Sequence, residues 1–185
     1  MVCRGLHTEK KPKKRVLPCR GLGECAIMTQ ILIDEEYRKQ LELELDKARH
    51  EIRIMMYRMQ RKISFGRAAG NIYLQALLKK KKEGVMIKVI VDIERRGGIT
   101  YKENLYTCLD LSEAGIECRE LRHNRVCHAK TVIIDSKVAI IGSHNWTSNS
   151  FKRNFEVSVK IWDWREVDRL AREFDKIFKG CSIIR

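Results

Sequence analysis

The chain has 185 residues, with 38 Lys and Arg against 24 Asp and Glu, and a formal net charge of +14 at pH 7. Its length suffices for one domain with a substantial hydrophobic core, and its apolar content of 44% is typical of a globular protein. No apolar run approaches the roughly 20 residues that span a bilayer, so we expect no transmembrane segment. The basic balance favours polyanionic partners, either nucleic acid or an anionic membrane surface.

The first 25 residues predict a basic arm that precedes the folded domain. They hold seven Lys or Arg, two Glu and both prolines, a net charge of +5, which leaves +9 on residues 26–185. Two interpretations of the arm stay open. One is a disordered tail that adds nonspecific affinity for polyanions. The other is a small zinc site formed by Cys3, His7, Cys19 and Cys25, although their spacing is not that of a standard zinc finger.

Cysteine usage and the N-terminal sequence predict a cytoplasmic protein. The seven cysteines are an odd number without a paired spacing, which is typical of reduced thiols in a reducing compartment. The first 15 residues contain no apolar stretch of the kind that secretory signals carry, so we expect no cleaved signal.

Residues 26–185 alternate between helical and strand patterns, which predicts a single α/β domain built on a mixed sheet. Apolar residues recur at helical spacing from Asp34 onward, and Gly84 separates a helical pattern from a β-rich run. The expected helices cover 34–48, 67–82, 101–113 and a last segment from 163 to about 178. The expected strands cover 52–57, 85–92, 116–121 and 156–161, with a hairpin around 128–145.

The segment from 128 to 156 concentrates the side chains that can carry chemistry. His128 and Lys130 are two residues apart, and residues i and i+2 of a strand point to the same face. Ser143 and Asn145 have the same spacing, and Glu156 follows at the start of the next expected strand. An imidazole, an ammonium, a hydroxyl, an amide and a carboxylate would then share one surface, which suits attack on a phosphodiester.

On these residues the chain resembles the phospholipase D superfamily, whose signature is His-x-Lys-x4-Asp followed by Gly-Ser-x-Asn and a downstream Glu. The matching residues are His128, Lys130, Asp135, Gly142, Ser143, Asn145 and Glu156. The resemblance implies a phospholipase D-like fold, with helices on both faces of a mixed sheet. The spacing is similar to that of the small single-motif endonucleases of the superfamily. Such members form homodimers to bring two motifs into one active site, and this chain carries the motif once.

The side chains indicate a division of roles. The neutral imidazole of His128 can attack phosphorus and form a covalent phosphohistidine, and a second group must protonate the leaving oxygen. Lys130 and Asn145 can donate to the non-bridging oxygens, and Ser143 could join them. Glu156 can accept from a histidine ring and fix its tautomer. This scheme uses no metal and no cofactor, so we expect the activity to survive EDTA.

Two signature residues are expected to serve the fold rather than the chemistry. Asp135 lies between two apolar runs and is predicted to belong to the turn of the hairpin. Gly142, at the end of the second apolar run, is grouped with it as a structural position of the signature.

Four residues around the signature are candidates for binding substrate. Trp146 could stack on a base beside the scissile phosphate, or it could pack in the core. Arg58 lies in a loop after one expected strand, and Arg95 and Arg96 lie in a loop after another. These loops could grip flanking phosphates or be solvated basic loops. His144 alternates away from its neighbours and is expected to be a packing residue.

Three functions are therefore compatible with the sequence. The leading hypothesis is a homodimeric, metal-independent endonuclease, a phosphodiester hydrolase that acts on DNA or RNA. The first alternative is a phospholipase or phosphatidyl transferase, which should expose an apolar patch near His128 where a nuclease should show a basic groove. The second alternative is a nucleic-acid-binding module that keeps the motif without activity, and the intact set of signature residues argues against it.

Overall fold

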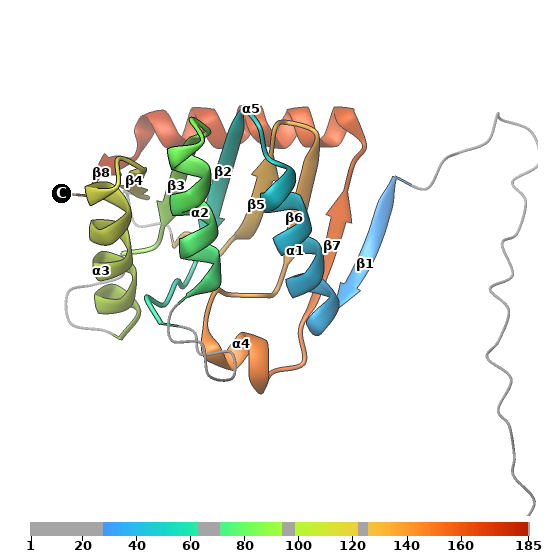
Figure 1. Cartoon of the computed structure of the whole chain (residues 1–185), viewed down its shortest axis with the longest axis horizontal. Helices are drawn as coiled ribbons and strands as arrows, with labels where there is room; N and C mark the ends of the chain where they lie inside the picture. The colour runs from blue at the N-terminus through green and yellow to red at the C-terminus, as the bar shows by residue number, and fades with distance from the viewer. Residues whose placement is uncertain (1–27, 63–70, 94–98, 122–125, 185) are drawn as a thin grey trace, which may run out of the picture.

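A computed structural model describes residues 28–62, 71–93, 99–121 and 126–184 (Figure 1). The strands are β1 (Thr29–Ile33), β2 (Glu51–Met56), β3 (Met86–Val91), β4 (Glu117–Glu120), β5 (Lys130–Ile134), β6 (Val138–Gly142), β7 (Val157–Ile161) and β8 (Ser182–Ile183). The helices are α1 (Glu35–Lys47), α2 (Ile72–Lys82), α3 (Ile99–Glu113), α4 (Ser148–Lys152) and α5 (Trp164–Gly180). The helices and strands expected from the sequence are present within the described residues, with ends that differ by a few residues, and positions 67–70 of the helix expected at 67–82 lie outside the described residues.

The strands form one mixed sheet in the order β1-β7-β6-β5-β2-β3-β4-β8. Strands β2, β3 and β4 are parallel neighbours, joined through α2 and α3 as crossover connections. The β5–β6 hairpin, β7 and β1 add antiparallel strands on one side, and β8 pairs antiparallel with β4 on the other. This arrangement confirms the predicted mixed-sheet α/β class.

The core has two layers because successive strand residues point to opposite faces of the sheet. In β2, Ile52 and Ile54 join the larger apolar cluster under α1, α2 and α3, whereas Met55 joins the second cluster. Helix α5 covers that second face with Val167 and Phe174 and runs across the strands (Figure 1). Helices therefore flank both faces, as the resemblance implied.

Three short elements have no counterpart in the sequence prediction. They are β1, the five-residue helix α4 and the two-residue strand β8. Helix α4 completes little more than one turn and β8 has two residues, so neither carries a recognisable period, and the β1 sequence Thr-Gln-Ile-Leu-Ile does not alternate between apolar and polar residues. They form because longer neighbours pair with them, as β7 does with β1 over five residue pairs. The predicted basic arm of residues 1–25 lies outside the described residues.

Within the described part of the chain, no helix is long and apolar enough to cross a membrane.

Candidate active site

The signature residues meet at one end of the sheet because the strands that carry them alternate in direction. Strand β5 starts where its antiparallel neighbour β6 ends, and β7 starts there as well. His128 and Lys130 lie at the start of β5, Ser143 and Asn145 just after β6, and Glu156 just before β7. The predicted constellation is therefore assembled, although Lys130 alone among these five lies within a strand.

Lys130 lies against both the backbone and the ring of His128. Its Nζ donates to the carbonyl oxygen of His128 at 2.8 Å and lies 3.2 Å from each ring nitrogen. His128 is exposed, whereas Lys130 is only 8% exposed. Burial lowers the pKa of the Lys130 ammonium, and the nearby Glu156 carboxylate opposes that effect. A cation beside an accessible imidazole can hold a bound phosphoryl group during attack.

The Tyr57 ring packs against the side chains of both His128 and Lys130, a role that the sequence did not reveal. Its ring centroid lies 4.6 Å from the ring of His128 and 4.9 Å from Nζ of Lys130. The face of an aromatic ring attracts a cation, so Tyr57 helps to keep the ammonium in place. The signal in the sequence that could have identified Tyr57 is its position, one residue past the end of β2.

Glu156 is the buried carboxylate of the site, with 6% of the residue exposed. Burial alone would raise its pKa, but hydrogen bonds from Ser143 and Asn154 outweigh this and hold the pKa below its usual value. Among the described residues, Ser143 and Asn154 donate to the Glu156 carboxylate, Ser150 adds a further side-chain hydrogen bond, and His128 does not donate to it. The expected hydrogen bond from a histidine ring is therefore not made among the described residues, although His144 interacts electrostatically with the carboxylate.

The backbone of Glu156 is fixed by Asp34, a residue 122 positions earlier in the chain. Oδ1 of Asp34 accepts from the Glu156 N–H at 2.8 Å, and the Asp34 N–H donates to the Glu156 carbonyl at 3.1 Å. Asp34 precedes α1, but its side chain makes no capping hydrogen bond to that helix. The Asp34 carboxylate thus holds the backbone of the site and does not cap the helix that follows it.

Trp146 packs in the core, the second of its two interpretations. It is 0% exposed, and its Nε1 donates to the hydroxyl of Tyr37 at 3.0 Å. A ring in this position has no free face on which a base could stack. His144 is also fully buried: it stacks on Tyr37 at 4.0 Å and its Nδ1 lies 2.8 Å from Oγ of Ser158, which confirms it as a packing residue.

Gly142 and Asp135 serve the fold, as predicted. A Cβ on Gly142 would lie 2.4 Å from the Cα of Ser158 on the neighbouring strand, so only glycine allows β6 and β7 to approach this closely. Asp135 lies in the hairpin turn with φ of 52° and accepts from the N–H groups of Arg49, His50 and Glu51 at 2.8–2.9 Å. Burial would raise the pKa of Asp135, but these donors lower it further than burial raises it.

Of the candidate phosphate-binding cations, the structure describes only Arg58. Its Nε lies 2.5 Å from Oε2 of Glu103, and the side chain is half-buried, so its charge is already partnered. Arg95 and Arg96 lie outside the described residues, as do the four candidate zinc ligands Cys3, His7, Cys19 and Cys25. In the described ranges, no group of three or more His, Cys, Asp or Glu could hold a metal ion.

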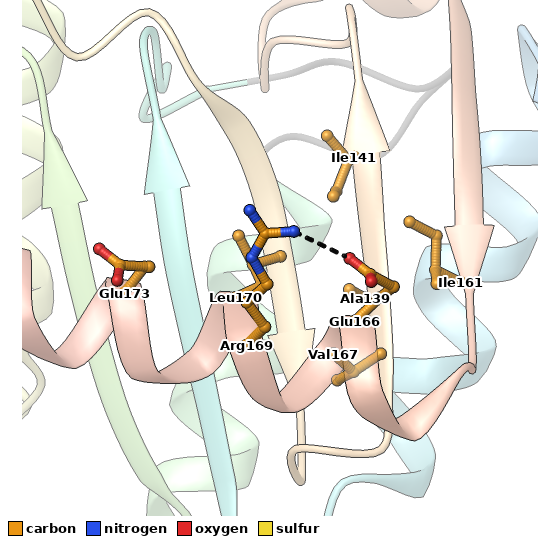
Figure 2. A pocket seen from close by; sticks show the side chains of 8 residues that line it. All are labelled: Ala139, Ile141, Ile161, Glu166, Val167, Arg169, Leu170 and Glu173. Atoms are coloured by element: carbon orange, nitrogen blue, oxygen red, sulfur yellow. Dashed lines mark ion pairs between the residues drawn. The ribbon is translucent and has the colours of Figure 1, made fainter.

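Apolar surface is exposed in two places: on the face of the sheet that α5 covers, and beside the signature residues. A cavity of about 280 Å³ lies between α5 and strands β6 and β7, where Ile141, Ile161 and Leu170 line it (Figure 2). Its rim carries the Arg169–Glu166 ion pair, and it contains no signature residue. Next to Glu156, Phe155 is 76% exposed. The register partners Ile33 and Val157 are each 43% exposed.

Comparison with known proteins agrees with this geometry. The family model described as "Cardiolipin synthase, PLD-like domain" matches residues 41–178. The cardiolipin synthase of Oceanobacillus iheyensis is 37% identical over 92 residues, which are 50% of this chain and 19% of that protein. The chain thus spans about a fifth of the length of the curated relatives it matches.

Solved structures share the fold over most of the chain. Nuc from Salmonella typhimurium, described as a phospholipase D family member, superposes with a TM-score of 0.71 and 22% identity over 85% of this chain and 97% of that one. NucT from Helicobacter pylori gives a TM-score of 0.66 and 19% identity over 84% and 98%. The family match covers most of the chain, including every signature residue, so this protein belongs to the PLD-like domain family of the phospholipase D superfamily of phosphodiester-acting enzymes.

Proposed function

We propose that this protein is a metal-independent phosphodiesterase that cleaves nucleic acid through a covalent phosphohistidine. The observation that carries the proposal is the exposed His128 ring beside the Lys130 ammonium, at the same end of the sheet as Ser143, Asn145 and Glu156. This set contains a nucleophile, donors for non-bridging oxygens and a carboxylate that can orient a histidine.

In the first step, a ring nitrogen of His128 attacks phosphorus while the bond to the leaving oxygen breaks. Lys130 and Asn145 donate to the non-bridging oxygens, where charge is held as the phosphoryl group transfers. The leaving oxygen takes a proton from a general acid. In the second step, water attacks the phosphohistidine, the phosphorus–nitrogen bond breaks, and the same acid, now deprotonated, removes a proton from the water.

The general acid comes from a second copy of the chain. One chain offers a single signature histidine, and its Glu156 carboxylate is bonded to Ser143 and Asn154 rather than to His128. A twofold dimer places the same surface of each copy face to face, so the second His128 can protonate the leaving group. Glu156 would then orient a histidine across the interface.

Charge favours nucleic acid as the substrate. A net charge of +14 attracts a polyanion over distances of several ångströms, and the portion outside the arm still carries +9. A cytoplasmic location fits a nucleic-acid substrate and unpaired cysteines.

Cleavage of labelled single-stranded DNA, duplex DNA and RNA in EDTA tests the proposal, with His128→Ala beside the unchanged protein. We expect cutting that persists in EDTA and disappears in the variant, and a dimer by light scattering. Mixed dimers of an unchanged chain and a His128→Ala chain should be inactive if two copies share one site, so an excess of the variant should lower the activity of the unchanged protein. Binding without cutting would support a non-catalytic nucleic-acid-binding module instead.

A phospholipid diester is the second candidate substrate, and a specific observation favours it. The exposed Phe155, Val157 and Ile33 form an apolar surface next to Glu156, which suits contact with lipid. The relative from Oceanobacillus iheyensis is a cardiolipin synthase by name. Incubation with phosphatidylglycerol vesicles separates the candidates, because a lipid enzyme should release or transfer a headgroup there and leave all three nucleic acids intact.

A further inference from the structure

A fully buried asparagine on α3 holds two chain segments that leave the sheet beside the site. Asn104 is 0% exposed, and its Nδ2 donates to the carbonyl oxygens of Tyr57 at 2.8 Å and Asp92 at 2.5 Å. Its Oδ1 accepts from the N–H of Met59 at 2.8 Å. Both amide protons and the amide oxygen are thus used on backbone groups, so this side chain fixes where the two segments run.

The first segment, residues 57–60, contacts both halves of the signature. The Tyr57 N–H donates to the carbonyl of Ala129, between His128 and Lys130, at 2.9 Å. Further along, the backbone of this segment pairs with Trp146: the Trp146 N–H donates to the residue 58 carbonyl at 3.0 Å, and the residue 60 N–H donates to the Trp146 carbonyl at 2.9 Å. Trp146 directly follows Asn145, so both halves of the signature are tied to one segment.

The second segment leaves the sheet at the end of β3, where Asp92 directly follows the strand. Asp92 is 4% exposed. Its Oδ1 accepts from the N–H of Cys127, the residue before His128, at 2.8 Å. Asn104 holds the carbonyl of Asp92, and Asp92 holds the backbone that leads into His128. A second route, meaning a chain of hydrogen bonds, therefore links Asn104 to the backbone beside His128, the proposed nucleophile. Both routes consist of buried hydrogen bonds between segments that are distant in sequence.

We propose that Asn104 is a positioning residue for the reaction: through Tyr57 and Asp92 it sets the placement of His128 and Lys130 without touching substrate. The kinetic part of this inference rests on the proposed phosphodiesterase function. His128 is exposed and lies outside β5, so the strand ladder alone does not fix its backbone. A displacement of about 1 Å at a reacting group can reduce a rate by about 10²-fold.

The test variant is Asn104→Leu, which keeps the approximate volume and removes all three hydrogen bonds. Its control is Leu45→Ala, a buried residue of α1, a helix with no part in either route. At a temperature where both variants are folded, we expect Asn104→Leu to lower kcat by about 10- to 100-fold, with KM within about threefold. Leu45→Ala should keep kcat within about threefold of the unchanged protein.

Asp92 offers a conservative pair that isolates the second route. Asp92→Asn keeps an oxygen that can accept from the Cys127 N–H, whereas Asp92→Ala removes it. We expect the asparagine variant to retain most of kcat and the alanine variant to lose it. Combined with Asn104→Leu, the alanine change should cost less than the product of the two single losses, because both act on the same segment.

Amide hydrogen exchange gives a readout that needs no substrate. Asn104 does not contact the N–H groups of Cys127 or Trp146, yet both routes end there. We expect exchange at these two amides to be at least about tenfold faster in Asn104→Leu, and unchanged in Leu45→Ala after correction for global stability. Unchanged kcat, or unchanged exchange at both amides, would overturn the inference. If the unchanged protein cleaves no diester, the exchange result alone decides it.

Discussion

The two ends of β5 differ in what their polar residues do. At its start, His128 is exposed and Lys130 lies against the ring and backbone of that histidine. At its other end, Asp135 accepts three backbone N–H bonds from the segment that leads into β2. The same seven-position signature therefore contains one end that is exposed at the candidate site and one end that joins two strands. A matched residue in a motif can serve architecture as fully as another serves chemistry.

The two carboxylates of the signature show the same contrast. Among the described residues, the Asp135 carboxylate accepts from backbone N–H groups, whereas the Glu156 carboxylate accepts from the side chains of Ser143 and Asn154 and lies within electrostatic range of Lys130. Loss of Asp135 should therefore lower stability, and loss of Glu156 should lower activity. The following predictions test that division, beginning with the largest effect.

Lys130→Met should lower kcat by roughly 10²- to 10³-fold, because it removes a donor aimed at the reacting phosphoryl group. The melting temperature should change little, since methionine fills similar space and a buried ammonium no longer has to be desolvated. Steady-state cleavage and thermal unfolding check both statements. Lys88→Met is the matched control, because Lys88 pairs with Asp175 on the α5 face and should keep full activity. A Lys130 variant with kcat within about threefold of the unchanged protein would remove Lys130 from the mechanism.

Glu156→Gln should lower kcat by about 10- to 100-fold, with a smaller effect on KM. Glutamine has the same shape, but one of its two terminal atoms is a donor, so it can no longer accept from both Ser143 and Asn154. Single-turnover kinetics measure the effect on the chemical step. Glu166→Gln, an exposed change on α5, serves as the control. Equal losses in both variants would show that Glu156 has no special role.

Asp135→Ala should destabilise the fold by about 1–3 kcal/mol, because three backbone N–H groups, one of them partly buried, lose a charged acceptor. The kcat of the folded protein should stay within about twofold. Asp163→Ala makes a matched comparison, since that side chain accepts one N–H bond at the start of α5 and its loss should cost less. Urea unfolding and activity measured below the transition give both numbers. A large fall in kcat for Asp135→Ala would contradict the architectural role.

The sequence predicts the signature and most longer elements because both depend on local spacing. The strand period and the His-x-Lys pattern act over a few residues, and the long elements were found with small errors at their ends. The environment of each signature residue depends instead on distant partners. The buried Trp146 donates its indole N–H to the hydroxyl of Tyr37, 109 residues earlier. Asp34 accepts from the backbone of Glu156 and does not cap the helix that follows it. Tyr57 reaches His128 because β2 happens to pair with β5. No local pattern encodes these neighbours.

The smallest predicted effect is the pH dependence of the Asp135 contribution. Its folded pKa lies below the ordinary 3.8, so the ionised form is the one that the fold favours. The stabilisation is therefore fully present above the unfolded pKa and declines as pH falls through the folded pKa. Asp135→Asn provides the reference, because asparagine also tolerates a positive φ but cannot ionise.

The difference in unfolding free energy between the unchanged protein and Asp135→Asn should be constant from pH 7 to about pH 5 and shrink below about pH 4. Urea titrations at pH 7, 5, 4 and 3 measure it, and all other acidic groups cancel in the difference. A difference that grows as the pH falls would mean that the protonated carboxyl is the favoured form. The three backbone donors would then not be the source of the stabilisation, and the contrast between the two ends of β5 would need another cause.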